Sequence, residues 1–309
     1  MRVAAIQTTA GVDRDANLAA AGDLAAEAAD DGARLIVLPE YFSVAGTPDV
    51  LRAGAEPLDG PTMAWAASTA SALGVHLVAG SFPERTGAAD GRLANTSCLV
   101  GPDGATLAVY RKMHLFDVAL RSVEFRESDT IAPGSDVVVV PLTPQLRRDD
   151  GVAPSAPSAP SAPSAPSAPS PTVLGLSLCY DIRFPELYRM LALAGATVVA
   201  VPAAFTEATG PAHWELLLRA RAVEDQVFVI GAGQVGTLPH GMPRCHGHSM
   251  VVDAWGTVLA ERTDPTPGVV VADLDFDALA DVRSRVPVLA NRRPAAYVGL
   301  HGNERGTTV

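Results

Sequence analysis

Short apolar runs alternate with helical patterns along most of this chain. In the first half, runs rich in Val, Ile and Leu predict buried strands, and apolar residues spaced three or four apart predict helices. These elements are, in order, strand 2–8, helix 17–29, strand 34–38, helix 61–73 and strand 75–81. Two further runs, 93–100 and 105–110, flank Gly-Pro-Asp-Gly and predict a hairpin.

The same alternation recurs in the second half. After a short strand at 137–141, the pattern predicts a strand from 172, helix 184–194, strand 197–202, helix 213–226, strand 227–230, a hairpin of 249–252 with 257–261, and strand 269–274. Two similar halves predict an α/β protein whose two sheets face each other with helices outside. We expect one domain over residues 1–309.

Two segments depart from this pattern. Residues 154–171 repeat Pro-Ser-Ala, which cannot bury a core and favours extended polyproline II, so we expect a removable surface-loop insertion rather than a docking peptide for a proline-binding partner. Residues 110–129 are rich in titratable groups, and we expect an irregular segment of the kind that carries chemistry.

Composition narrows the partners. The net charge is −11, with 23 Lys and Arg against 34 Asp and Glu and no basic block, which argues against nucleic acid and anionic membranes. Three cysteines lie far apart, no apolar run reaches membrane-spanning length, and MRVAAIQT opens without a signal pattern. We therefore expect a cytoplasmic protein in a reducing compartment.

The most informative stretch is TVLGLSLCYDIRFPE, residues 172–186. It predicts a buried strand followed by a helix, which places Cys179 at a strand-to-helix corner. Backbone N–H groups exposed at such a corner favour a thiolate and can hold an oxyanion. The alternative is a packed core cysteine, because free cysteines are among the most buried residues.

Two other residues stand out. Glu40 follows the buried strand 34–38, where open α/β sheets often place functional groups, although an ordinary ion-pairing glutamate also fits. Lys112 is the single lysine among the 23 basic residues. Its retention indicates a site that needs a compact ammonium rather than a guanidinium, unless it survives by chance.

Three motif-like patterns are incomplete. Gly231, Gly233 and Gly236 have dinucleotide-binding spacing, but prolines and glycines follow where a helix must begin. His240, Cys245, His246 and His248 match no common zinc pattern, so we expect no metal site. The run GLSLC lacks the last glycine of a serine nucleophile elbow.

Together, Glu40, Lys112 and Cys179 form a workable acyl-transfer set. A thiolate attacks a carbonyl, a glutamate moves the proton to the leaving amine, and the ammonium with a backbone N–H stabilises the oxyanion. This chemistry needs no cofactor, only a small amide substrate and water. The rival hypothesis is a catalytically inactive scaffold that binds a partner through the Pro-Ser-Ala tract.

Three motifs resemble those of the nitrilase, or carbon-nitrogen hydrolase, superfamily: LPE at 38–40, YRKMHLFD at 110–117 and CYDIRFPEL at 179–187. The resemblance implies a four-layer α-β-β-α sandwich that forms a homodimer or higher homo-oligomer through further helices. It also implies a triad of Glu40, Lys112 and Cys179, a second glutamate at Glu127, and an oxyanion N–H at Tyr180.

The segments 202–226 and 247–261 resemble the branch of deaminated-glutathione amidases and omega-amidases. The resemblance implies metabolite repair: hydrolysis of the terminal carboxamide of a small 2-oxo carboxylate through a cysteine thioester, with ammonia released. The other branches left open are carbamoylases, aliphatic amidases and nitrilases. Arg183 aligns with a carboxylate-binding arginine of carbamoylases, or is structural. The pocket-loop candidates are Phe205, Thr206 and Thr209.

Overall fold

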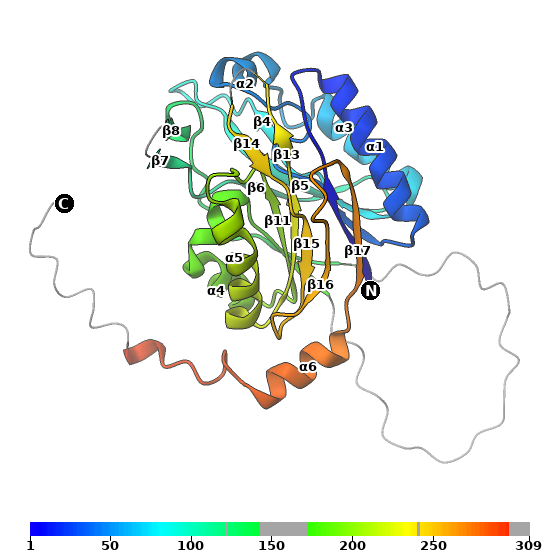
Figure 1. Ribbon diagram of the computed structural model, residues 1–309, viewed down its shortest axis with the longest axis vertical. Coiled ribbons are helices and arrows are strands. Elements are labelled where there is room, and N and C mark those ends of the chain that lie inside the picture. Colours follow the sequence, from blue (N-terminus) through cyan, green and yellow to red (C-terminus); the bar gives the residue numbers. More distant parts are fainter. Residues whose placement is uncertain (121–122, 143–171, 240–241, 297–309) are drawn as a thin grey trace, which may run out of the picture.

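Two β-sheets face each other, and helices cover their outer faces (Figure 1). The computed structural model describes residues 1–120, 123–142, 172–239 and 242–296. The Pro-Ser-Ala tract at 154–171 and His240 lie outside the described residues. In the part of the chain that is described, no helix is long and apolar enough to cross a membrane.

The first sheet has the order β17-β1-β2-β3-β5-β4, and β6 pairs with β5. Strands β1, β2 and β3 are parallel, and the other pairs are antiparallel. Its strands are β1 (Arg2–Gln7), β2 (Leu35–Val37), β3 (His76–Val78), β4 (Phe82–Glu84), β5 (Ala94–Val100), β6 (Thr106–Arg111) and β17 (Gly268–Asp273).

The second sheet has the order β16-β15-β12-β11-β10-β9, with β10, β11 and β12 parallel. Its strands are β9 (Val139–Pro141), β10 (Val173–Leu176), β11 (Val198–Ala203), β12 (Phe228–Gly233), β15 (Met250–Val252) and β16 (Val258–Glu261). Two small hairpins lie beside the sheets: β7 (Asp117–Leu120) with β8 (Val123–Arg126), and β13 (Val235–Thr237) with β14 (Arg244–His246).

Three apolar clusters define four layers. Side chains of both sheets, such as Val37 and Ile230, form the central cluster. The second cluster packs α1 and α3 against the first sheet, and the third packs α4 and α5 against the second. The helices are α1 (Arg14–Asp30), α2 (Pro48–Gly54), α3 (Pro61–Leu73), α4 (Pro185–Leu193), α5 (Gly210–Asp225) and α6 (Phe276–Arg285), with 3₁₀ turns η1 (Glu127–Asp129), η2 (Cys179–Arg183) and η3 (Pro294–Ala296). The predicted α-β-β-α sandwich is confirmed.

Local signals set several boundaries. Helix α3 has Pro61 in its first turn and ends at Gly74, which has the left-handed φ of 63° that favours glycine. Helix α1 begins three residues earlier than predicted, because the Asp13 carboxylate accepts a hydrogen bond from the Ala16 N–H. Both predicted hairpins are present, as β5–β6 and β15–β16.

The prediction of an irregular segment at 110–129 is wrong in part. Residues 117–120 and 123–126 pair as the antiparallel strands β7 and β8, and η1 follows β8 directly. The alternation of apolar and polar residues there is short, which leaves little signal for a strand. Helices α2 and α6, strand β4 and the β13–β14 hairpin were not predicted from the sequence. Of these elements, α2 and β14 contribute residues such as Leu51 and Cys245 to the pocket in which the predicted site residues meet.

Candidate active site

Glu40 projects from the turn after β2 and is almost fully buried. Asn95 Nδ2 donates to Glu40 Oε1 at 2.9 Å, and the Ala204 N–H, after β11, donates to Oε2 at 2.9 Å. The carboxylate is therefore held by both sheets, with a defined orientation. The residue before Glu40 is also closely packed: glycine is required at Gly80, because a Cβ there would lie 1.9 Å from the Pro39 carbonyl oxygen.

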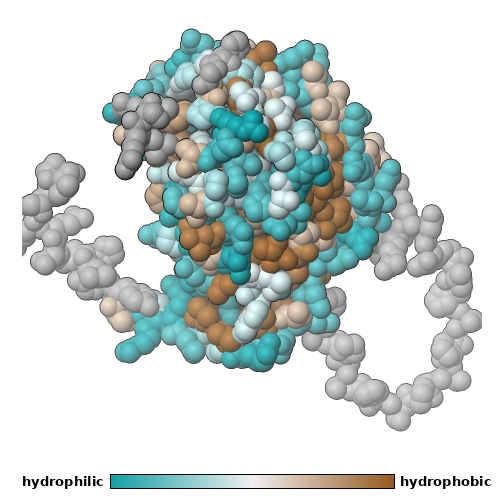
Figure 2. Space-filling view, in the orientation of Figure 1, coloured by the Kyte–Doolittle hydropathy of each residue, from teal (hydrophilic) through white to brown (hydrophobic). Residues whose placement is uncertain are grey.

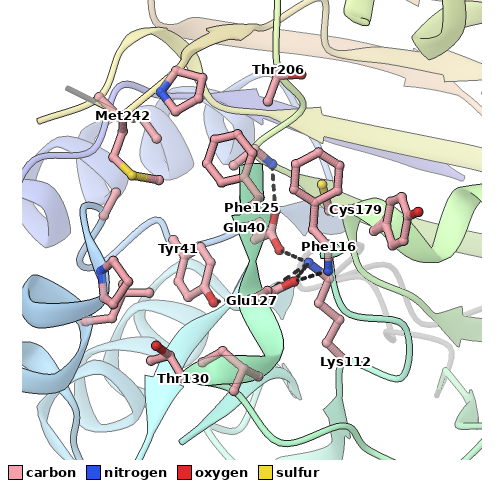
Figure 3. A pocket seen from close by; sticks show the side chains of 18 of the residues that line it. Glu40, Tyr41, Lys112, Phe116, Phe125, Glu127, Thr130, Cys179, Thr206 and Met242 are labelled. Atoms are coloured by element: carbon pink, nitrogen blue, oxygen red, sulfur yellow. Dashed lines mark hydrogen bonds and ion pairs between the residues drawn. The ribbon is translucent and has the colours of Figure 1, made fainter. Parts of the chain in front are cut away.

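Lys112 lies just beyond β6, and its side chain is 2% exposed. Its Nζ donates to Glu40 Oε1 at 2.9 Å and to Glu127 Oε2 at 2.9 Å, as the dashed lines in Figure 3 show. Burial by itself lowers the pKa of Lys112, but the two carboxylates outweigh it and raise the pKa well above its usual value. The side chain is a permanent cation.

Glu127 begins η1, immediately after the β7–β8 hairpin. Its Oε2 accepts a hydrogen bond from the Phe116 N–H at 2.7 Å, and its Oε1 accepts from Tyr41 Oη and Asn95 Nδ2, each at 3.3 Å. Asn95 thus contacts both carboxylates that contact the lysine. The structure places Glu127 beside Lys112, where the family resemblance implied a second glutamate.

Cys179 is the first residue of η2 and is 8% exposed. Its φ of 44° is left-handed, an uncommon conformation for a residue other than glycine. Burial, together with the charge and hydrogen bond of Glu40, raises the pKa of the Cys179 thiol well above its usual value, although Lys112 opposes this. The expectation that the corner favours a thiolate is therefore wrong: the resting group is a thiol.

These charges suit general-base catalysis. A neutral thiol needs proton transfer to become nucleophilic, and the Glu40 side chain is in hydrogen-bond reach of it. Lys112 supplies fixed positive charge where negative charge develops on a carbonyl oxygen. The arrangement is able to form and hydrolyse an acyl-cysteine.

The site opens into a pocket of about 700 Å³ (Figure 3). Its lining includes the four predicted reactive residues and all five predicted substrate contacts: Glu40, Lys112, Glu127, Cys179, Tyr180, Arg183, Phe205, Thr206 and Thr209. Arg183 Nη1 lies 3.2 Å from His213 Nδ1, its Nη2 lies 3.4 Å from Thr209 Oγ1, and its guanidinium lies 5.1 Å from the centre of the Phe205 ring.

Several residues that line the pocket or support its reactive groups were not predicted from the sequence: Tyr41, Arg52, Asn95, Phe116, Phe125, Arg126, Thr130, Leu238, Met242 and Cys245. Tyr41 adjoins Glu40 in sequence, which was an available signal. Asn95 carried none, because it lies within the continuous strand β5. Cys245 belongs to β14 and lines the pocket; among the described residues, no group of three His, Cys, Asp or Glu is arranged to hold a metal ion.

The glycine-rich run 231–236 does not have the structure that a dinucleotide-binding motif requires. Gly231 and Gly233 lie within β12, and Gly236 lies in β13, so strand rather than helix follows. The pyrophosphate-binding helix N-terminus that the motif requires is not formed by these residues.

Comparisons with known proteins identify the family. The carbon-nitrogen hydrolase family profile matches residues 2–284. The deaminated glutathione amidase of Bos taurus is 38% identical over 302 residues, covering 96% of this chain and 84% of that protein. Omega-amidase NIT2 of Danio rerio is 35% identical over 297 residues, covering 96% of both.

Solved structures agree. Saccharomyces cerevisiae Nit3, a member of branch 10 of the nitrilase superfamily, has a TM-score of 0.77 at 28% identity and covers 95% of this chain and 96% of its own. An amidase mutant from Nesterenkonia sp. AN1, with acrylamide added at its active-site cysteine, has a TM-score of 0.71 at 26% identity, covering 97% and 99%. This chain belongs to the carbon-nitrogen hydrolase family, within the nitrilase superfamily.

Proposed function

We propose that this protein is an amidase that hydrolyses the amide of a small 2-oxo carboxylate through a cysteine acyl-enzyme. The observation that carries the proposal is the buried Lys112 ammonium, bonded to both Glu40 and Glu127 beside the Cys179 thiol. The names of the relatives supply the substrate class: deaminated glutathione first, with the omega-amidase substrate 2-oxoglutaramate as the alternative.

The reaction proceeds in two halves. Glu40 takes the thiol proton as Cys179 Sγ attacks the amide carbon, and it returns that proton to the nitrogen as the C–N bond breaks. A thioester and a free amine result. Water then attacks the thioester with Glu40 again as base, which releases the carboxylic acid and restores the thiol.

Lys112 and the Tyr180 N–H stabilise the oxyanion in both halves of this mechanism. Glu127 holds the ammonium in place through contacts of 2.9 and 3.2 Å. The lysine is the cationic centre of the cluster, because its Nζ forms an ion pair with each of the two carboxylates.

Arg183 is the proposed anchor for the substrate carboxylate. Its guanidinium faces the pocket between an aromatic ring and the hydroxyls of the 205–209 loop, where Thr206 Oγ1 lies 3.3 Å from Thr209 Oγ1. A planar guanidinium matches a carboxylate with two parallel hydrogen bonds. Phe205 supports the guanidinium from one face.

The two substrates form the same kind of acyl-enzyme and differ in the leaving group. 2-Oxoglutaramate has a terminal carboxamide and releases ammonia, whereas deaminated glutathione has a substituted amide and releases a peptide-sized amine. The expected release of ammonia therefore applies to 2-oxoglutaramate and not to deaminated glutathione. A pocket of about 700 Å³ is large for the smaller amide and accommodates the larger one. This volume favours the deaminated-glutathione type, and the role is metabolite repair in the cytoplasm.

A homodimer is part of the proposal. Helices α4 and α5 pack side by side and expose large apolar side chains, Met190 at 51% and Leu216 at 65%, and Figure 2 shows hydrophobic side chains among polar ones over this face. A second copy of the chain would cover them. Leu216→Glu tests this: we expect a dimer to become a monomer in analytical ultracentrifugation, and a monomeric wild type contradicts it.

The activity test is product release from deaminated glutathione, 2-oxoglutaramate, an N-carbamoyl amino acid, an aliphatic amide and a nitrile. Because the first substrate releases no ammonia, the assay measures the carboxylic acid product for each by mass spectrometry. We expect a preference for a 2-oxo acid amide that Cys179→Ala abolishes. A preference for one of the last three compounds assigns another branch of the family.

A further inference from the structure

The reactive groups reach the pocket from different sheets. Cys179 follows β10 of the second sheet, whereas Lys112 follows β6 of the first. The left-handed φ of Cys179 is costly for a side chain of this kind, so the surrounding structure has to hold the turn in place. We call residues 178–183 the cysteine turn and residues 110–114 the lysine segment. The contacts between them therefore decide whether the thiol and the ammonium come together.

Asp181 makes these contacts. It lies two residues after Cys179, is 0% exposed and accepts hydrogen bonds from both segments. Within its own turn, the Leu178 N–H donates to Oδ2 at 2.8 Å. From the lysine segment, Tyr110 Oη donates to Oδ2 at 2.6 Å, and the His114 N–H donates to Oδ1 at 3.0 Å.

The lysine segment is bound on both sides of Lys112. Tyr110 lies two residues before it, and His114 lies two residues after it. His114 Nδ1 is also 2.8 Å from Asp181 Oδ1, and since a carboxylate only accepts, Nδ1 carries the donated proton. The His114 ring stacks on Phe184, with centroids 3.7 Å apart, which adds an aromatic contact to the hydrogen bonds between the same two segments.

We propose that Asp181 is a positioning residue, which sets the distance between the Cys179 thiol and the Lys112 ammonium across the two sheets. The inference rests on the proposed function, because it assigns Cys179 and Lys112 to the reaction. Asp181 is buried behind the cysteine turn and acts only through these partners. A misplacement of about 1 Å in such a site costs about 100-fold in rate.

The test is Asp181→Asn, which keeps the shape of the side chain but replaces one acceptor oxygen with a donor NH₂ group. Asp225→Asn is the matched control: Asp225 is 1% exposed and joins α5 to α4 through Arg189 at 3.1 Å, outside the pocket. Two readouts are compared for folded protein: kcat and KM, and the rate at which iodoacetamide alkylates Cys179, followed by mass spectrometry of its peptide.

We expect Asp181→Asn to lower kcat about 100-fold, with KM changed less than about threefold, and to slow alkylation at least about tenfold. Asp225→Asn should keep both rates within about twofold. The alkylation readout needs no substrate. If the wild type hydrolyses none of the amides but Asp181→Asn slows alkylation, the proposed function fails and the positioning role stands.

A purely structural role predicts a lower melting temperature with unchanged kcat and alkylation rate in the folded fraction, and that result overturns the proposal. If Asp181→Asn does not fold by circular dichroism, Tyr110→Phe decides. It keeps the ring and removes one of the donors, and we expect kcat to fall about threefold to tenfold. An unchanged kcat and alkylation rate in Tyr110→Phe overturn the proposal equally.

Discussion

Replacing Lys112 with methionine isolates the role of the buried charge. Methionine keeps an unbranched apolar stem but removes the ammonium that lies 2.9 Å from both Glu40 and Glu127. The side chains of these glutamates are 3% and 13% exposed, so little water replaces the lost cation. Two carboxylates sharing one nitrogen at these distances lie about 5 Å apart, and like charges that close cannot both stay ionised.

The size of the effect follows from Coulomb's law. Two unit charges about 5 Å apart at an effective dielectric constant of about 20 repel by about 3 kcal/mol, which disfavours ionisation of both carboxyls in the variant. In Lys112→Met the folded pair then keeps one proton at pH values where the unfolded glutamates, with an ordinary pKa of about 4.3, have already released theirs. The folded state binds more protons in this window, so its stability falls as the pH rises through it.

The assay is urea unfolding of wild type and Lys112→Met at pH 5 and pH 8. We expect the loss of unfolding free energy in the variant to be about 2 kcal/mol larger at pH 8 than at pH 5. Lys112→Arg is the control, because it keeps the charge: its loss should not vary with pH, although kcat falls severely because the guanidinium cannot occupy the ammonium position. An equal loss at both pH values for Lys112→Met refutes the reasoning.

Three other outcomes are expected. Cys179→Ala should retain the wild-type circular dichroism spectrum with no turnover, and in the wild type a thioester on Cys179 should appear by mass spectrometry; residual turnover above about 1% contradicts covalent catalysis. Glu40→Gln should abolish turnover yet lower the pKa of Cys179, because the carboxylate that opposes ionisation of the thiol is gone while Lys112 remains. The pH dependence of the thiolate absorbance measures this pKa, and an unchanged or raised value contradicts the prediction. Burial raises the pKa of Asp225 to about 6 from an ordinary 3.8, so the folded state holds a proton that the unfolded chain releases. Stability from this group is lost as the pH rises from 4 to 6, and Asp225→Asn should remove about 2 kcal/mol of that decline in urea unfolding; parallel pH profiles refute this.

Local sequence signals were sufficient for much of the fold. The Pro61 and Gly74 pair bounds α3, and Gly-Pro-Asp-Gly marks the β5–β6 hairpin, because each residue acts on its own backbone conformation. Two site residues were predictable from their own chemistry: Cys179, which ends an apolar run, and Lys112, which is the single lysine. The motifs around them pointed to the family before any geometry was known.

Tertiary structure decided the electrostatics of the site. Asn95 bonds to Glu40, 55 residues away in the sequence, and Asp181 bonds to Tyr110, 71 residues away. No local sequence pattern around Asn95 or Asp181 predicts these partners. The thiol form of Cys179 likewise depends on burial and on Glu40. Ionisation and hydrogen bonding follow from distances between segments that only the packed sheets bring together, because both fall off over a few ångströms and are independent of order along the chain.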